Sequence, residues 1–314
     1  MTTSAIAVSG LRKTFGDKTV LDGIDFDVPA GTVFSLLGPN GAGKTTTVNV
    51  LTTLIKADSG TVRVAGHDVA AEAKAVRSAI GVTGQFAAVD ELLTGRENLQ
   101  LMVDLSPVAA KDGKRIVTDL LERFDLVESA DKSAATYSGG MQRKLDLAMT
   151  LVGNPRIIFL DEPTTGLDPR SRRTMWTIIR ELLADGVTIF LTTQYLDEAD
   201  QLADRIAVLN KGKLVAEGTP EELKRQIPGT HVRFRFASFD DLEVAAGVLP
   251  ESTRDDDALT LRVPSDGGTK SVRALLDRLD EHSLDAEEFS VHTPDLDDVF
   301  LALTGHDTAE VVAK

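Results

Sequence analysis

The segment GPNGAGKTT constrains the fold of this chain more than any other stretch. It has the spacing G-x-x-x-x-G-K-[ST], directly after the apolar run TVFSLLG at 32–38 and before a helical stretch. Small residues let backbone N–H groups turn inward around phosphate oxygens, a lysine adds charge there, and a hydroxyl can ligate Mg²⁺. The pattern therefore predicts a phosphate-binding loop of Gly38, Pro39, Asn40, Gly41, Ala42, Gly43, Lys44, Thr45 and Thr46, with Lys44 at the β and γ phosphates and Thr45 at the metal.

Four unbroken apolar runs predict the sheet around this loop. They are too continuous for half-exposed strands, and they favour a sheet covered on both faces; they lie at 32–38, 156–162, 187–193 and 205–210. Thr174 to Gly186 has helical spacing and stops at a glycine, which predicts an α/β layered fold. Helical patterns between Ala88 and Asn154 predict a helical insert in the same domain.

Charge divides the chain into two domains. The net charge is −15 over 314 residues, yet residues 229–314 hold 8 basic and 19 acidic side chains, a net −11. We expect one domain at 1–228 and an acidic one at 229–314, whose runs HVRFRF, ALTLRV and EEFSVH alternate with helical stretches as in a small ferredoxin-like α+β unit. Solubility alone would also explain such acidity. The charge argues against binding to nucleic acid or directly to lipid headgroups.

Residue types exclude several other classes. The chain has no cysteine, so disulfides, thiolate catalysis and Cys-ligated zinc are excluded. No apolar run approaches the roughly 18 residues of a transmembrane helix, and the start MTTSAIAVSG lacks the pattern of a secretory signal. We therefore expect a cytoplasmic location.

Two carboxylates follow the apolar run IIFL. Asp161 and Glu162 stand at the carboxyl end of the predicted strand, where one can hold Mg²⁺ and the next can orient or deprotonate an attacking water. Taken alone, Asp-Glu before a proline is typical of a solvated turn. Downstream of a phosphate loop, the catalytic interpretation is favoured.

The segment YSGGMQRKLDLAMTLV places a hydroxyl and two glycines before a helix. This arrangement of donors and helix dipole suits an anion, although alone it would be read as an N-cap serine and a flexible turn. The ordered set GPNGAGKTT, TGQF, YSGG, FLDEPTTGLD and LTTQYLDEAD resembles the nucleotide-binding domain of an ABC ATPase, from about Ile6 to Pro228. The fold implied is a P-loop NTPase, a RecA-like core with the ABC helical subdomain.

The resemblance implies a role for each motif. Asp161 is expected to be the Walker B carboxylate at Mg²⁺, and Glu162 the catalytic one. Gln85 would sense Mg²⁺ and water and link to a membrane partner. Asp168 falls in the D-loop, and Ser138, Gly139 and Gly140 would clasp the γ phosphate of ATP held by a second copy. Phe15 takes the place of the adenine-stacking aromatic, although a lone phenylalanine in such a stretch would equally fit the core. Tyr137 and Met141 depart from the common Leu-Ser-Gly-Gly-Gln.

Position 194 is the other departure. The family places a switch histidine directly after the strand VTIFLTT, and here the residue is Gln194. An amide offers donors and an acceptor but does not titrate near neutral pH. We expect Gln194 to be a neutral γ-phosphate contact, although a turn residue without that role would also fit.

A finer resemblance is to the ATP-binding subunits of daunorubicin and doxorubicin resistance exporters. It is carried by VTGQFAAVDELLTGRENL, TYSGGM, LTTQYLDEADQLADRIAVL and the end DLDDVFLALTG. It implies an energy-coupling subunit that binds MgATP and drives a separate membrane permease, which would dock on 88–154. Because only one P-loop and one signature are present, two copies are expected to form a head-to-tail dimer. The subunit would then lie at the cytoplasmic face of the membrane. The alternatives are a soluble ABC ATPase of translation or DNA maintenance, and a P-loop kinase or GTPase, which would leave YSGG and TTGLD unexplained.

Overall fold

The computed structural model describes residues 4–304 apart from 86, 226–228, 250 and 293. The chain divides into two compact units, Met1–Pro220 and Glu221–Lys314. The predicted boundary falls slightly later, next to residues 226–228, which lie outside the described part, as do residues 305–314 of the predicted acidic domain. Among the helices of the described residues, none combines the length and hydrophobicity that crossing a bilayer requires.

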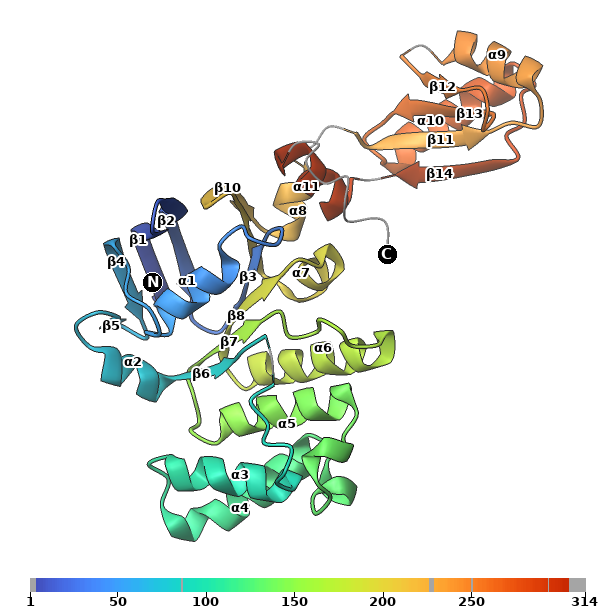
Figure 1. Ribbon diagram of the computed structural model, residues 1–314. Coiled ribbons are helices and arrows are strands. Elements are labelled where there is room, and N and C mark those ends of the chain that lie inside the picture. The colour runs from blue at the N-terminus through green and yellow to red at the C-terminus, as the bar shows by residue number, and fades with distance from the viewer. Residues whose placement is uncertain (1–3, 86, 226–228, 250, 293, 305–314) are drawn as a thin grey trace. The chain divides into compact units, whose positions relative to one another are not determined.

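A six-stranded sheet forms the centre of the first unit (Figure 1). All neighbours are parallel except the edge strand β10. Every residue of β3, β7 and β8 is buried, which is the pattern of a parallel sheet covered on both faces. The strand order is β10 (Lys213–Gly218), β9 (Arg205–Asn210), β3 (Val33–Leu37), β8 (Thr188–Thr193), β7 (Ile157–Asp161) and β6 (Ile80–Thr83), so the four predicted runs are β3, β7, β8 and β9.

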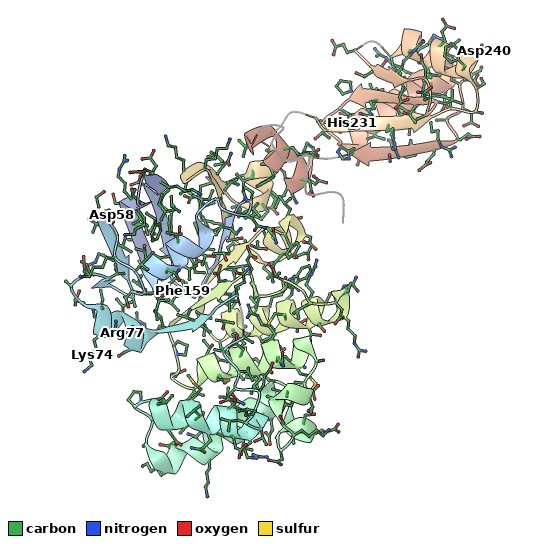
Figure 2. All side chains as sticks on the ribbon, viewed as in Figure 1. Asp58, Lys74, Arg77, Phe159, His231 and Asp240 are labelled. Carbon is green, nitrogen blue, oxygen red and sulfur yellow. The ribbon has the colours of Figure 1, made fainter. Side chains whose placement is uncertain are left out.

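A second, antiparallel sheet lies against the first. Its order is β2 (Lys18–Pro29), β1 (Ser4–Phe15), β4 (Ser59–Val64) and β5 (His67–Asp68). Phe26 of this sheet stacks on Phe34 of β3 with ring centroids 5.3 Å apart, and Phe34 stacks in turn on Phe190 of β8 at 5.6 Å. Phe159 of β7, labelled in Figure 2, extends the same aromatic core, 5.5 Å from Phe190. These rings fix the distance between the two sheets.

Helices surround the parallel sheet and form the insert. Those that alternate with its strands are α1 (Lys44–Leu51), α2 (Ala73–Ala79), α6 (Pro169–Ala184) and α7 (Leu196–Leu202). Between β6 and β7 the chain forms α3 (Gly95–Leu105), α4 (Ala110–Arg123), the 3₁₀ turns Val127–Ser129 and Ala134–Thr136, and α5 (Gly139–Leu151). Thr94 and Glu97 cap α3 reciprocally. Apolar residues of α3, α4 and α5 share one buried cluster with α6, β7 and β8 (Figure 1). The insert also packs on the sheet directly, since the hydroxyls of Thr150 in α5 and Thr83 in β6 lie 3.1 Å apart.

The second unit contains a four-stranded antiparallel sheet in the order β12-β13-β11-β14. Its elements along the chain are β11 (His231–Arg235), α9 (Phe239–Val248), β12 (Thr253–Asp255), β13 (Thr260–Pro264), α10 (Thr269–Glu281) and β14 (Glu288–His292), flanked by α8 (Pro220–Arg225) and α11 (Leu296–Thr304). This β-α-β-β-α-β order is the ferredoxin-like arrangement that the sequence predicts. Val232, Phe234 and Leu261 centre its core.

Candidate functional site

The predicted phosphate loop connects β3 to α1. Gly43 precedes the first residue of α1 with φ of 115°, a backbone conformation that favours glycine, and no side chain caps the helix. A Cβ at Gly43 would lie 2.7 Å from Leu21 Cδ2 and 3.0 Å from Val20 O. Because the first turn of a helix leaves backbone donors without intrahelical partners, the N–H groups of Lys44, Thr45 and Thr46 can meet an anion there.

Lys44 is almost fully buried under the loop. Its Nζ donates to the carbonyl oxygens of Gly38 at 2.8 Å and Pro39 at 3.3 Å. It also lies 3.1 Å from Glu162 Oε1, and the exposed fractions of the two side chains are 4% and 7%. One buried cation is therefore shared by the loop backbone and the second carboxylate of the predicted pair.

Asp161 and Glu162 stand where β7 ends. The Thr192 hydroxyl donates to Asp161 Oδ1, which fixes one carboxylate oxygen. The backbone N–H of Glu162 donates to Thr192 O at 3.0 Å. Glu162 has φ of 50°, a left-handed conformation that non-glycine residues adopt at a cost and that is concentrated at functional sites. This turn aims the Glu162 side chain at Lys44 while Asp161 faces β8.

An open cavity of about 380 Å³ is lined by eight of the predicted site residues, six of them in the phosphate loop. The Gln85 amide donates to Glu162 Oε2 at 3.5 Å, and the Thr165 hydroxyl donates to the same oxygen at 3.4 Å. The cavity is lined by Lys18, Val20, Asn40, Gly41, Gly43, Lys44, Thr45, Thr46, Gln85 and Glu162. The structure thus brings together the phosphate loop, Gln85 and Glu162.

The YSGG segment lies outside the lining of this cavity. Ser138 is the N-cap of α5 and accepts from Met141 N at 3.3 Å. A Cβ on Gly140 would lie 2.7 Å from Ser171 Oγ, which donates to Asp168 Oδ2 at 2.5 Å. Gly140 and Asp168 therefore lie on either side of Ser171. The Ser171 side chain, followed by backbone N–H donors, holds the pKa of the Asp168 carboxyl below its ordinary value.

The two departures in the signature face the core of the insert. Tyr137 is buried, and its hydroxyl donates to Ser129 O at 2.7 Å, while burial raises its pKa. Met141 is partly buried against the same apolar cluster. Both side chains therefore pack inside the helical segment, and the serine and glycines stay at its edge.

Phe15 and Gln194 stand at the margins of the site. Phe15 is half exposed, with Lys13 Nζ 5.2 Å from its ring centroid, and it does not line the cavity. Gln194 is partly buried and directly follows β8, where Gly38 N donates to Thr193 O at 3.3 Å. This hydrogen bond places the backbone before Gln194 beside the start of the phosphate loop.

Sequence reasoning missed the residues that hold the carboxylate turn in place. Thr192 and Thr165 contact the two carboxylates, and Glu198 of α7 accepts from the Thr164 hydroxyl at 2.9 Å and from Trp176 Nε1 at 3.2 Å. Burial raises the pKa of Glu198 against hydrogen bonds that lower it. The sequence offered one signal for Glu198, its place beside Ala199 and four residues before Leu202 on the apolar face of α7. A glutamate in a short helix is nevertheless normally interpreted as exposed.

The chemistry of these groups fits a magnesium-bound nucleotide. Lys44 and the helix donors match phosphate oxygens, and the Thr45 hydroxyl and Asp161 carboxylate are the oxygen ligands that Mg²⁺ prefers.

Comparison with known proteins identifies the family. Residues 21–165 match the family described as ABC transporter, and residues 218–304 match the family described as ATP-binding protein DrrA1-3-like, C-terminal domain. Over 309 residues and 98% of both chains, the protein is 47% identical to the daunorubicin resistance ATP-binding protein DrrA3 of Streptomyces coeruleorubidus. It is 42% identical to the doxorubicin resistance ATP-binding protein DrrA of Mycobacterium tuberculosis, over 96% of this chain and 93% of that one.

More distant relatives extend the same picture. The Nod factor export ATP-binding protein I of Ralstonia nicotianae is 36% identical, with 97% of this chain and 95% of the relative covered. Among solved structures, an ATP-binding cassette of an ABC transporter in its ADP conformation covers 70% of this chain and 93% of its own, at 28% identity and a TM-score of 0.64. These matches confirm the predicted family and the P-loop NTPase fold. The chain belongs to the ATP-binding proteins of ABC transporters, which are ATPases, in the group whose C-terminal domain is DrrA-like.

Proposed function

We propose that this chain is the ATP-hydrolysing subunit of an ABC exporter. The observation that carries the proposal is the cavity in which Glu162 Oε1 and Lys44 Nζ lie 3.1 Å apart, because it joins a phosphate-binding cation to a carboxylate able to orient water. Relatives named for drug resistance and for Nod factor export favour export over a permease-free role in translation or DNA maintenance.

The proposal assigns a role to each residue of the site. The phosphate loop and Lys44 would bind the β and γ phosphates of ATP, and Thr45 and Asp161 would hold Mg²⁺, which when bound neutralises phosphate charge. Glu162 orients the attacking water, and Gln85, 3.5 Å from it, adjusts the carboxylate. Gln194 acts as a neutral contact to the γ phosphate, and Phe15 supplies a ring for adenine.

The second part of the proposal concerns assembly. Ser138, Gly139 and Gly140 do not line the cavity that holds Lys44, and Asp168 lies beside them through Ser171. A head-to-tail dimer would let these groups close over ATP bound to the other copy. The insert at 88–154 would dock on a membrane permease and hold the subunit at the cytoplasmic face, with an amphipathic small molecule as cargo. We do not expect nucleic acid to be a partner.

Substitution of Lys44 tests the nucleotide site. Lys44→Ala should abolish ATP turnover and weaken ATP binding at least tenfold, because it removes the cation that meets the phosphates. The matched control is Lys56→Ala, an exposed lysine of the same unit. Binding is measured by titration calorimetry and turnover by phosphate release. Wild-type values for both variants would refute the assignment.

A further inference from the structure

Arg143 is a buried cation that the motifs do not account for. It lies in α5, one turn after the signature glycines, and only 6% of it is exposed. Its Nε donates to Pro163 O at 2.8 Å, and its Nη2 donates to Asp161 O at 3.3 Å. Its Nη1 donates to Gly84 O at 2.7 Å. A single planar guanidinium therefore holds three backbone carbonyls from two separate loops.

Asp146 completes the arrangement one turn further along α5. Its Oδ2 lies 3.3 Å from Arg143 Nη1, and its Oδ1 accepts from Ala88 N at 3.0 Å. Burial lowers the pKa of Arg143 and raises that of Asp146, while the attraction between the two opposes both shifts. The pair is thus an internal ion pair whose outer hydrogen bonds go to backbone.

The contacts of this pair bracket the two residues that meet at the nucleotide cavity. Gly84 and Ala88 lie on either side of Gln85, and Asp161 and Pro163 lie on either side of Glu162. Neither Arg143 nor Asp146 lines that cavity. Displacement of Gly84 and Ala88 would take one acceptor from buried Arg143 and one donor from buried Asp146, and a buried charged group that loses a hydrogen-bond partner is destabilised.

We infer that Arg143, held by Asp146, is a positioning residue that fixes Gln85 against Glu162 and couples displacement of Gly84 and Ala88 to the catalytic carboxylate. The inference rests on the proposed function, in which Glu162 orients water and Gln85 adjusts that carboxylate. Because α5 begins at Ser138, the same guanidinium also ties the signature helix to that carboxylate. Guanidinium geometry matters here, since lysine carries the charge but lacks the planar fork that reaches three carbonyls.

The test separates turnover from nucleotide binding. Arg143→Met should lower kcat about 10- to 100-fold, the size of effect that a misplaced catalytic group produces, while ATP affinity stays within about twofold. Arg143→Lys should recover only part of kcat, and Asp146→Asn, which keeps an acceptor for Ala88 N, should lower kcat less than Arg143→Met. The matched control is Arg205→Met, which breaks the ion pair to Glu217 at 3.1 Å elsewhere in the same unit and should leave kcat unchanged.

A double-mutant cycle with Gln85→Ala decides between positioning and general stabilisation. If Arg143 acts through Gln85, the loss of kcat caused by Arg143→Lys should shrink when Gln85 is already alanine. Melting temperatures are measured for every variant. If Arg143→Lys and Asp146→Asn lower the melting temperature but keep wild-type kcat, or if the cycle is additive, the inference is wrong. Unchanged turnover in Lys44→Ala would instead refute the proposed function.

Discussion

Replacing Glu162 with glutamine should strengthen ATP binding while stopping hydrolysis. Lys44 Nζ loses an anionic partner at 3.1 Å but keeps the carbonyl oxygens of Gly38 and Pro39. A hydrogen bond to a charged group contributes about 1.5–3 kcal/mol. Because Lys44 keeps two other acceptors, the interaction energy that it loses with Glu162 should lie near the lower value. Since about 1.4 kcal/mol is a factor of ten in affinity, and since a phosphate competes with Glu162 for Lys44, ATP affinity should rise up to roughly tenfold.

The same substitution removes the carboxylate that we propose orients water. Single-turnover hydrolysis should fall by about 10²- to 10⁴-fold, the usual contribution of a general base. Calorimetric titration with MgATP gives the affinity, and labelled phosphate release gives the rate. Glu181→Gln, at an exposed site on α6, is the control and should match the parent in both. Folded Glu162→Gln with weaker ATP binding would contradict the shared-cation argument, and normal hydrolysis would show that Glu162 is only a turn residue.

Two further predictions concern α7 and the end of β8. Burial raises the pKa of Glu198 above the ordinary 4.5. The stability that the protonated Glu198 contributes is therefore complete below pH 4.5 and is lost as the pH rises through the folded-state pKa. The melting temperature of Glu198→Gln should consequently rise relative to that of the parent as the pH rises, and a difference in melting temperature that does not depend on pH would refute the argument. Gln194→Ala should slow single-turnover hydrolysis more than it weakens ATP binding. Gln194→His should keep hydrolysis activity, and its rate should gain a pH dependence near the imidazole pKa of ~6.5. If Gln194→Ala hydrolyses ATP at the parent's rate at every pH, Gln194 has no catalytic role.

The strands that the sequence predicts are those buried on both faces. β3, β7, β8 and β9 read as unbroken apolar runs because both faces of the sheet are covered, one by α1 and the antiparallel sheet and the other by α6 and the insert. β6 was missed because it is four residues long and contains Gly81, whose Cβ would lie 2.4 Å from Thr150 Cγ2. The antiparallel sheet was missed as well, since register shifts along β1 and β2 break the alternation by which a half-buried strand is recognised.

For the site too, the sequence predicts some features and not others. Motif spacing predicts that the phosphate loop and the end of β7 meet, because the carboxyl ends of parallel strands lie at one edge of the sheet. Spacing does not predict which side chain takes which partner. The contact between Lys44 and Glu162 depends on the left-handed backbone at Glu162, and the place of Arg143 depends on two loops folding over α5. A charged residue inside a helical pattern reads as an exposed face until the loops that cover it are known.

The buried charges of the described residues gather around the end of β7. They comprise two cations, Lys44 and Arg143, and four carboxyl groups, those of Asp146, Asp161, Glu162 and Glu198. Each cation already has a carboxylate partner, Glu162 for Lys44 and Asp146 for Arg143. Burial raises the pKa of Glu198, so this carboxyl holds its proton more readily. Asp161 is left with a threonine hydroxyl as its side-chain partner, and a buried carboxylate so placed is stabilised most by a cation. We therefore propose that a divalent metal binds at Asp161 together with the nucleotide, rather than ATP alone.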